Sequence, residues 1–127
     1  MKKILILFIL STISTTAFAE WTLIQTNDEA NMYVDFDTLQ KTGNTVTVTT
    51  LNDYNSLQPR DELSTKWREI HDCKNKRFKP LAIDYYSKNM GQGSVIESTT
   101  FDEAKTAWSD VVPYSIGELK TNIICSR

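Results

Sequence analysis

The most continuous hydrophobic segment of the chain lies at its N-terminus. Two lysines precede an unbroken apolar run, Ile4 to Leu10, which is followed by a Ser/Thr stretch and then by Ala17-Phe18-Ala19. A basic start, a short apolar run and a small-x-small tripeptide are typical of a secretory signal peptide that signal peptidase removes. The run is much shorter than the roughly 20 residues that a membrane-spanning helix needs. We therefore predict a signal peptide over residues 1–19 and a mature domain over residues 20–127.

Beyond this segment, runs of β-branched and aromatic residues alternate with turn residues. Trp21 to Thr26 and Met32 to Asp35 are predicted to be strands. Gly43-Asn44 is a turn pair that directly precedes the strand-forming run Thr45 to Thr49, and it predicts a β-hairpin. Asp35 to Leu39 is predicted to form one helical turn, because aspartate readily caps free backbone N–H groups.

The middle of the chain carries two further strands. From Ser64 to Cys73 the residues alternate, and the two faces hold Trp67, Glu69, His71 and Cys73 on one side and Lys66, Arg68, Ile70 and Asp72 on the other. Since neither face is cleanly apolar, we expect this strand near an edge of the sheet. In the next strand, Arg77 to Ser87, Pro80 lacks an N–H donor and indicates an edge or a bulge. A loop over residues 90–93 and a strand over residues 94–100 follow.

A helix is predicted at the C-terminus. Ser115 and Glu118 have the spacing of a capping box, and Ile116, Leu119 and Ile123 recur on one helical face. The predicted fold class is therefore α+β. It is a single small domain in which an antiparallel sheet carries a C-terminal helix packed on one face.

Size, charge and cysteine content limit the class of protein. Removal of 19 residues from 127 leaves 108, enough for one domain with a modest core. Without Lys2 and Lys3, 12 basic and 16 acidic residues give a net charge of −4, which argues against a general nucleic-acid binder.

The two cysteines, Cys73 and Cys125, both lie in the exported part, where an oxidising compartment favours a disulfide. Two buried free thiols are the alternative. A bond closing a loop of about 51 residues is expected to stabilise the fold by roughly 4 kcal/mol in the chain-entropy model.

No catalytic set or cofactor motif is found in the sequence. His71 is the single histidine, and its neighbour Asp72 points to the opposite face of the strand, so a packing role is favoured over acid–base chemistry. Asp35-Phe36-Asp37 resembles the Asp-x-Asp of metal-dependent transferases, but a role at a helix start is favoured. We therefore predict no enzyme activity, no metal and no cofactor.

Basic residues are concentrated between positions 66 and 79. Against Glu69 and Asp72 they give a local charge of +4, leaving −8 for the rest of the mature chain. Such a patch could bind an acidic protein, an acidic glycan or lipid A phosphates, or it could be the solvated tip of a hairpin. The candidate ligand-binding residues are Lys66, Arg68, Lys74, Lys76, Arg77 and Lys79.

A series of short motifs resembles the surface-adhesin protein E family in order and spacing. They run from Trp21 to Cys125 and comprise Tyr33-Val34-Asp35, Gly43-Asn44 with Val46, Leu51 with Asp53-Tyr54, Gln58-Pro59, Asp72-Cys73-Lys74, Tyr86-Ser87, Met90-Gly91-x-Gly93, Trp108 and Pro113-x-Ser115.

The resemblance implies a small antiparallel sheet with helical elements and a noncatalytic adhesin that binds host matrix or serum proteins such as vitronectin, laminin and plasminogen. The residue directly after the predicted cleavage site is Glu20 and not cysteine, so a lipid anchor at that position is not expected. The protein is thus expected in the periplasm or secreted. An envelope accessory protein, acting as an inhibitor or stress factor in the periplasm, is the alternative function.

Overall fold

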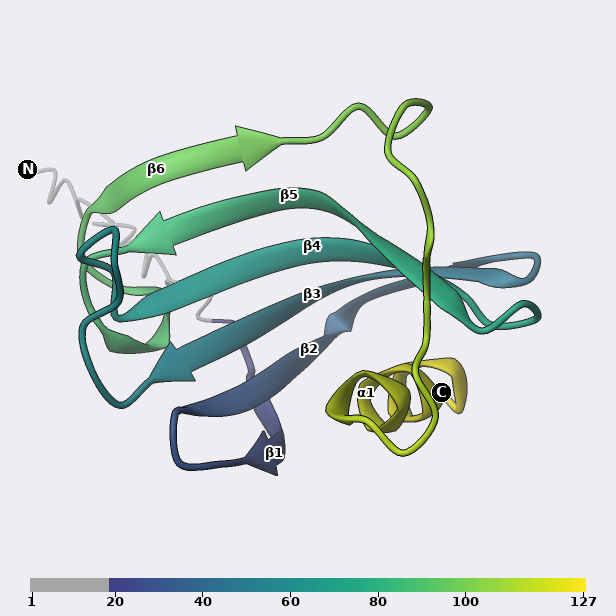
Figure 1. Ribbon diagram of the computed structural model, residues 1–127, viewed down its shortest axis with the longest axis horizontal. Helices are drawn as coiled ribbons and strands as arrows, with labels where there is room; N and C mark the ends of the chain where they lie inside the picture. Colours follow the sequence, from purple (N-terminus) through teal and green to yellow (C-terminus); the bar gives the residue numbers. More distant parts are fainter. Residues whose placement is uncertain (1–18) are drawn as a thin grey trace, which may run out of the picture.

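The sheet is antiparallel throughout and follows the order of the chain. The computed structural model describes residues 19–127, so most of the predicted signal peptide lies outside the described residues. Six strands form the order β1-β2-β3-β4-β5-β6, and a short β7 pairs with β5 (Figure 1). The elements are β1 (Thr22–Thr26), β2 (Ala30–Thr42), β3 (Thr45–Tyr54), β4 (Ser64–Asp72), β5 (Arg77–Tyr86), the 3-10 turn η1 (Asn89–Gly91), β6 (Val95–Thr100), β7 (Ser109–Asp110) and α1 (Ile116–Cys125).

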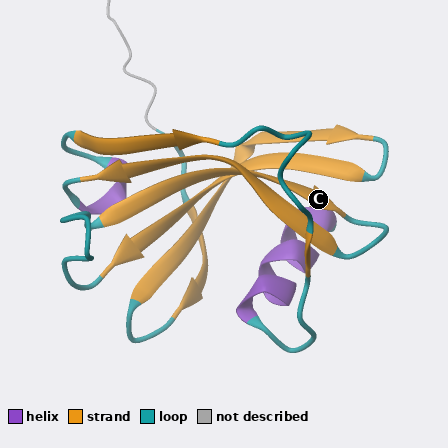
Figure 2. Cartoon of the chain, turned by 45° about the horizontal axis from the view of Figure 1, so that its top comes forward, coloured by secondary structure: helices purple, strands orange, loops and turns teal. Residues whose placement is uncertain are grey.

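The single α-helix of the described chain lies against one face of the twisted sheet (Figure 2). We call this the helix face; it carries Val46, Val48, Glu69 and His71, and the far face carries Leu51, Arg68 and Lys79. The connection from β6 runs past the start of β5, where β7 pairs with it, before it reaches α1. Within residues 19–127, no helix has the length and apolar character needed to cross a bilayer.

The predicted fold class and three local features are confirmed. The β2–β3 hairpin turns at Gly43-Asn44, where Gly43 has a φ of 60° that glycine adopts at little cost. Ser115 caps α1, because its hydroxyl accepts a hydrogen bond from the N–H of Glu118 at 3.1 Å. Pro80 lies beside a register shift between β4 and β5, as expected for a bulge.

The helical turn predicted over Asp35 to Leu39 is wrong, since this segment belongs to β2. The register of β2 against β3 shifts between Asp35 and Gln40. Within this bulge the Thr38 hydroxyl donates to the Asp35 carbonyl and accepts from the Thr49 N–H, so that a side chain replaces a ladder bond. Asp35 does accept from the N–H of Asp37, a local bond that occurs in bulges as well as in helix caps.

The expectation that β4 lies near an edge is also wrong. It pairs with β3 over its whole length and with β5 on its other side. Its polar side chains Glu69, His71 and Asp72 are buried, so the mixed pattern reflects internal polar contacts rather than exposure. A buried polar group is tolerated where hydrogen bonds satisfy it, and a sequence pattern does not show those bonds.

The core beneath α1 is small. Its buried members are Val34, Val46, Val48 and Ile124, and partly buried neighbours include Phe36 and Cys73. The helix directs Thr121 and Ile124 to the sheet, whereas the predicted apolar positions Ile116 and Leu119 remain exposed. Ile123 is partly buried, so two of the three residues on the predicted apolar face of the helix lie at the surface.

The disulfide between Cys73 and Cys125 is confirmed and ties the end of α1 to the end of β4. Because the core is small, the restriction of the unfolded chain by this bond is a large share of the stability.

We expect the double change Cys73→Ser and Cys125→Ser to lower the free energy of unfolding by about 4 kcal/mol, since the bond closes a long loop. Urea unfolding followed by circular dichroism measures this loss. Wild-type protein kept in reductant is the matched control and should unfold at nearly the same urea concentration as the variant. Equal stability of oxidised and reduced wild type would contradict the expectation.

Candidate functional site

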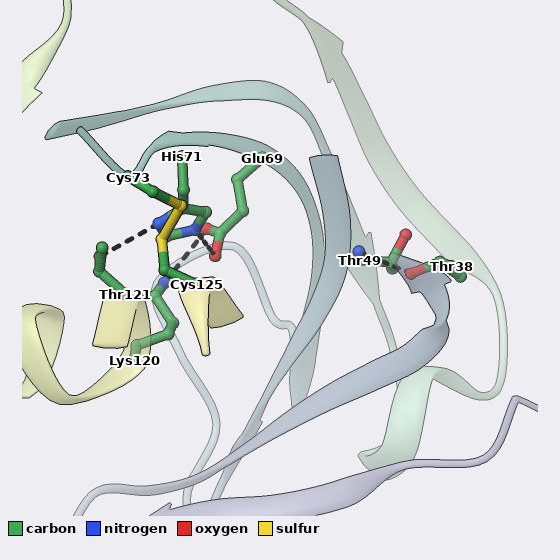
Figure 3. A network of polar contacts seen from close by, with 8 residues as sticks. All are labelled: Thr38, Thr49, Glu69, His71, Cys73, Lys120, Thr121 and Cys125. Atoms are coloured by element: carbon green, nitrogen blue, oxygen red, sulfur yellow. Dashed lines mark hydrogen bonds and ion pairs between the residues drawn. A yellow bond between two sulfur atoms is a disulfide. The ribbon is translucent and has the colours of Figure 1, made fainter. Parts of the chain in front are cut away.

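His71 lies in a buried polar network between β4 and α1 (Figure 3). Its Nε2 atom is 2.9 Å from Oε1 of Glu69, and its Nδ1 atom is 3.0 Å from Oγ1 of Thr121. Lys120 donates from Nζ to the other carboxylate oxygen of Glu69 at 3.1 Å. Alternation along β4 places Glu69 and His71 on the helix face, and adjacent positions of α1 supply the two partners. Phe78 stacks on the imidazole ring of His71.

The order carboxylate, imidazole, hydroxyl matches that of an acid, base and nucleophile in a hydrolase triad. A catalytic hydroxyl, however, must be reachable by a substrate atom. The residues Thr121 and His71 both have 0% exposed surface. The network therefore holds α1 against the sheet, and the packing role predicted for His71 is confirmed.

Two carboxyl groups at this end of the sheet have altered acidity. Burial raises the pKa of the Glu69 carboxyl, but the Lys120 ammonium and the hydrogen bond with His71 together outweigh burial, so the pKa lies below its ordinary value. Hydrogen bonds from the side chain and backbone of Asn75, aided by Arg77, lower the pKa of Asp72 from 3.8 to about 2. Both groups are therefore carboxylates at neutral pH.

The six predicted basic residues do not form one exposed patch. The β4–β5 register pairs Asp72 with Arg77 and Ile70 with Lys79, so the two basic residues of β5 share the far face with Lys66 and Arg68. Lys74 and Lys76 belong to the β4–β5 turn and are exposed, as is Arg68.

The other three residues are held by contacts within the protein. Lys79 is buried, and its Nζ donates to the Glu103 carbonyl at 2.7 Å. Arg77 donates to Asp72 at 2.9 Å. The Nζ of Lys66 lies 5.2 Å from the centre of the Tyr86 ring. Lys76 also donates from Nζ to the Asn122 amide oxygen of α1 at 3.1 Å, although it remains exposed. Arg68, Lys74 and Lys76 are thus the exposed part of the predicted set.

The sequence did not predict the aromatic side chain that Arg77 and Lys79 contact. The Trp108 ring lies 4.7 Å from the Arg77 guanidinium and 4.5 Å from the Lys79 ammonium, measured to the ring centre. A lone tryptophan in an irregular segment gave no signal for this contact. Lys41 was also missed; it is exposed and lies in the adjacent β2–β3 hairpin, at the same end of the sheet as the β4–β5 turn.

Metal ligands are not brought together in the part of the chain that the structure describes. Residues 19–127 contain no cluster of three or more His, Cys, Asp or Glu side chains suited to hold an ion. Asp35 is buried in the β2 bulge, whereas Asp37 is exposed. The Asp-x-Asp pair therefore lies in the β2 bulge, where Asp35 accepts from the N–H of Asp37. The predicted role at a helix start is wrong.

A family model described as surface-adhesin protein E matches residues 21–126. The chain belongs to the surface-adhesin protein E family. No curated protein matches it. The crystal structure of protein E from non-typeable Haemophilus influenzae is similar, with a TM-score of 0.61 at 18% identity over 88% of this chain and 79% of that one. Crystal form II of Haemophilus influenzae protein E gives a TM-score of 0.57 at 17% identity, over 87% and 97% of the two chains. At this identity the likeness establishes the shared fold.

Several residues that carried the adhesin E resemblance meet on the far face. The Asp53 carboxylate accepts from the N–H of Met90 at 2.8 Å and from the Asn89 amide at 3.0 Å. The Ser64 hydroxyl accepts from the N–H of Gly91 and donates to the Lys88 carbonyl. Met90 has a φ of 60°, so these bonds fix a strained turn. In this adhesin E protein, the Asp53-Tyr54 and Met90-Gly91 motifs therefore close the end of the sheet.

The lowered pKa values predict acid sensitivity. A carboxyl whose folded pKa is depressed contributes stability above its unfolded pKa and loses that contribution as pH falls through its folded pKa. The window for Asp72 thus lies between pH 3.8 and about 2, and Glu69 adds a loss that begins below its ordinary value of 4.5. Urea midpoints should be level from pH 7 to pH 5 and then decline.

The change Asp72→Asn removes one of these contributions and should make the decline shallower. Asp110→Asn removes an exposed carboxyl that makes no ion pair within residues 19–127 and serves as the matched control. Identical acid profiles for wild type and Asp72→Asn would contradict the assignment.

Proposed function

We propose that this chain is an exported, noncatalytic binding protein that engages an acidic partner through the exposed basic end of its sheet. Membership of the adhesin E family over residues 21–126 is the observation that carries the proposal. The burial of Thr121 and His71 supports the absence of catalysis, because the triad-like network has no open side. The predicted signal peptide supports export.

The basic end consists of Lys41, Lys74 and Lys76, which are exposed on two adjacent hairpins. The two hairpin turns extend beyond the helix at the same end of the sheet (Figure 1). At the opposite end of these strands, the turn before β2 and the loop before β4 carry exposed Asp28, Glu29 and Asp61. Opposite charges at the two ends would orient the protein toward an acidic partner during encounter.

The partner class that fits this end is an acidic segment of a host matrix or serum protein, as the adhesin family suggests, or an acidic glycan. Exposed lysines on turns attract an acidic partner at long range. Salt screens this attraction beyond about 10 Å at 0.1 M ionic strength. Such charges mainly raise the association rate rather than the lifetime of a complex.

Charge reversal tests the basic end. We expect Lys74→Glu with Lys76→Asp to slow association with an immobilised acidic glycan such as heparin about tenfold at low salt, with little change in dissociation. Aspartate is chosen at position 76 because Lys76 has a φ of 52°, a region that aspartate tolerates. Surface plasmon resonance measures both rates. Lys88→Glu and Lys105→Glu change the net charge equally at exposed sites elsewhere and are the matched control. Equal losses in both double variants, or indifference to salt, would contradict a localised site.

Location separates a surface adhesin from a periplasmic accessory protein. We expect the mature chain to begin at Glu20 and to be cleaved by protease added to intact host cells if it is displayed. N-terminal sequencing identifies the first residue of the mature chain. Fractionation of the host and treatment of intact cells with protease show where the chain is located. Recovery only in the periplasmic extract, protected from added protease, would support the accessory role and remove surface adhesion.

A further inference from the structure

An apolar corner stands out where the chain enters α1. Val112, Tyr114, Ile116 and Leu119 are 65%, 100%, 41% and 40% exposed. Ile116 and Leu119 are three residues apart on α1 and therefore share one face of the helix. Val112 and Tyr114 precede the helix by only a few residues. We call these four residues the apolar corner.

The corner is held rigidly. The Val112 carbonyl accepts from the backbone N–H of Ser115 at 3.3 Å and from its hydroxyl at 2.6 Å. The same hydroxyl accepts from the N–H of Glu118 and so joins the turn to the helix. A side chain on such a turn loses little freedom on binding, and this favours affinity.

Tyr114 adopts a backbone conformation that is unfavourable for a tyrosine. Its φ is 62°, in the left-handed region where glycine or asparagine is usual. The side chain is completely exposed, so packing within the chain does not offset the strain. Strained residues that nothing in the fold requires are found at binding sites, because strain fixes the direction of a side chain.

Acidic side chains border the corner. Asp110 precedes it, and Glu118 lies within its helical turn. Neither makes an ion pair within residues 19–127. Of the neighbouring basic residues, Lys120 is paired with Glu69, whereas Lys76 donates to the uncharged Asn122 amide of α1 and keeps its charge. Two carboxylates against this one ammonium leave a net charge of −1 at the border, which disfavours an anionic membrane surface and favours a cationic occupant.

We propose that the apolar corner is a second binding surface, which adjoins the basic end at Lys76 and takes a partner protein's peptide segment with apolar side chains interspersed with lysine or arginine. Tyr114 would supply the anchor, as exposed tyrosines with few rotatable bonds do at interfaces. Asp110 and Glu118 would pair with the basic side chains of the segment. The proposal does not depend on the function assigned to Lys41, Lys74 and Lys76.

The probe is a short fluorescein-labelled peptide that alternates leucine with lysine, measured by fluorescence anisotropy. Two matched peptides replace every lysine by glutamate or every leucine by serine. We expect the wild-type protein to bind the first peptide and to bind both matched peptides at least about tenfold more weakly. No binding of the first peptide, or equal binding of all three, would overturn the proposal.

Two variants locate the contact. Tyr114→Gly removes the ring and relieves the backbone strain, so we expect unchanged or higher thermal stability with about tenfold weaker peptide binding. Val112→Ser removes a second apolar side chain and should also weaken binding. The matched control is Val95→Ser, which removes a 52% exposed valine from β6 and should leave binding unchanged. Loss of binding in Val95→Ser alone would place the peptide on the β6 edge and overturn the proposal.

Other occupants give distinct results. Sedimentation showing that the wild type self-associates, and that Tyr114→Gly abolishes this, would assign the corner to a second copy of the chain. Tyr114-dependent binding to phosphatidylcholine vesicles without binding to the peptide would assign it to lipid. Either result would overturn the peptide proposal. Retained peptide binding in the Lys74→Glu and Lys76→Asp variant would support a contact with the apolar corner, and lost binding would assign the peptide to the basic end and overturn the proposal.

Discussion

The position of α1 depends on one buried carboxylate. The Glu69 side chain is 2% exposed, and burying an unpaired carboxylate costs several kcal/mol. That cost is offset only when His71 and Lys120 both reach the group, and Lys120 does so only when the helix docks in one rotation and one axial position. The disulfide limits how far the helix can separate from β4, and the polar network then selects its orientation. With so few buried apolar side chains beneath the helix, packing alone would select it weakly.

The same constraint explains why apolar side chains of α1 face outward. Successive residues of an α-helix are turned by about 100°, so a helix that directs Lys120, Thr121 and Ile124 to the sheet cannot also direct Leu119 there. The pairing of Glu69 with Lys120, rather than the hydrophobic pattern of the helix, thus determines which face of α1 lies on the sheet. A chain that used α1 only as a cover for the sheet would gain by placing its apolar stripe inward. The outward stripe is therefore a feature of the helix that folding does not explain.

Features determined by local chemistry could be predicted from the sequence. Gly43-Asn44 and the Ser115 cap act within a few residues, and an exported chain with two cysteines has one possible internal pairing. The errors have a different cause, because they all concern side chains whose partners are distant in sequence. Thr38 takes the place of a ladder bond to Thr49, and Glu69 meets Lys120 from another element. For the same reason, six clustered basic residues could be found from the sequence, but the enclosure of Lys79 by the segment around Trp108 could not.

The two surfaces differ in how the fold supports them. The proposed basic end lies on two hairpins, where a lysine can be replaced without loss of a buried contact, and attraction there would depend on charge at long range. The proposed apolar corner lies on a capped helix whose orientation Glu69 fixes, so its contacts would depend on shape at short range. The motifs that carry the family resemblance, Asp53-Tyr54 and Met90-Gly91, instead bond to each other at the end of the sheet away from both surfaces. A fold maintained by such contacts can persist at 18% identity while the exposed turns change. The Asp53 contacts therefore maintain the fold without involving the residues of the basic end or of the apolar corner.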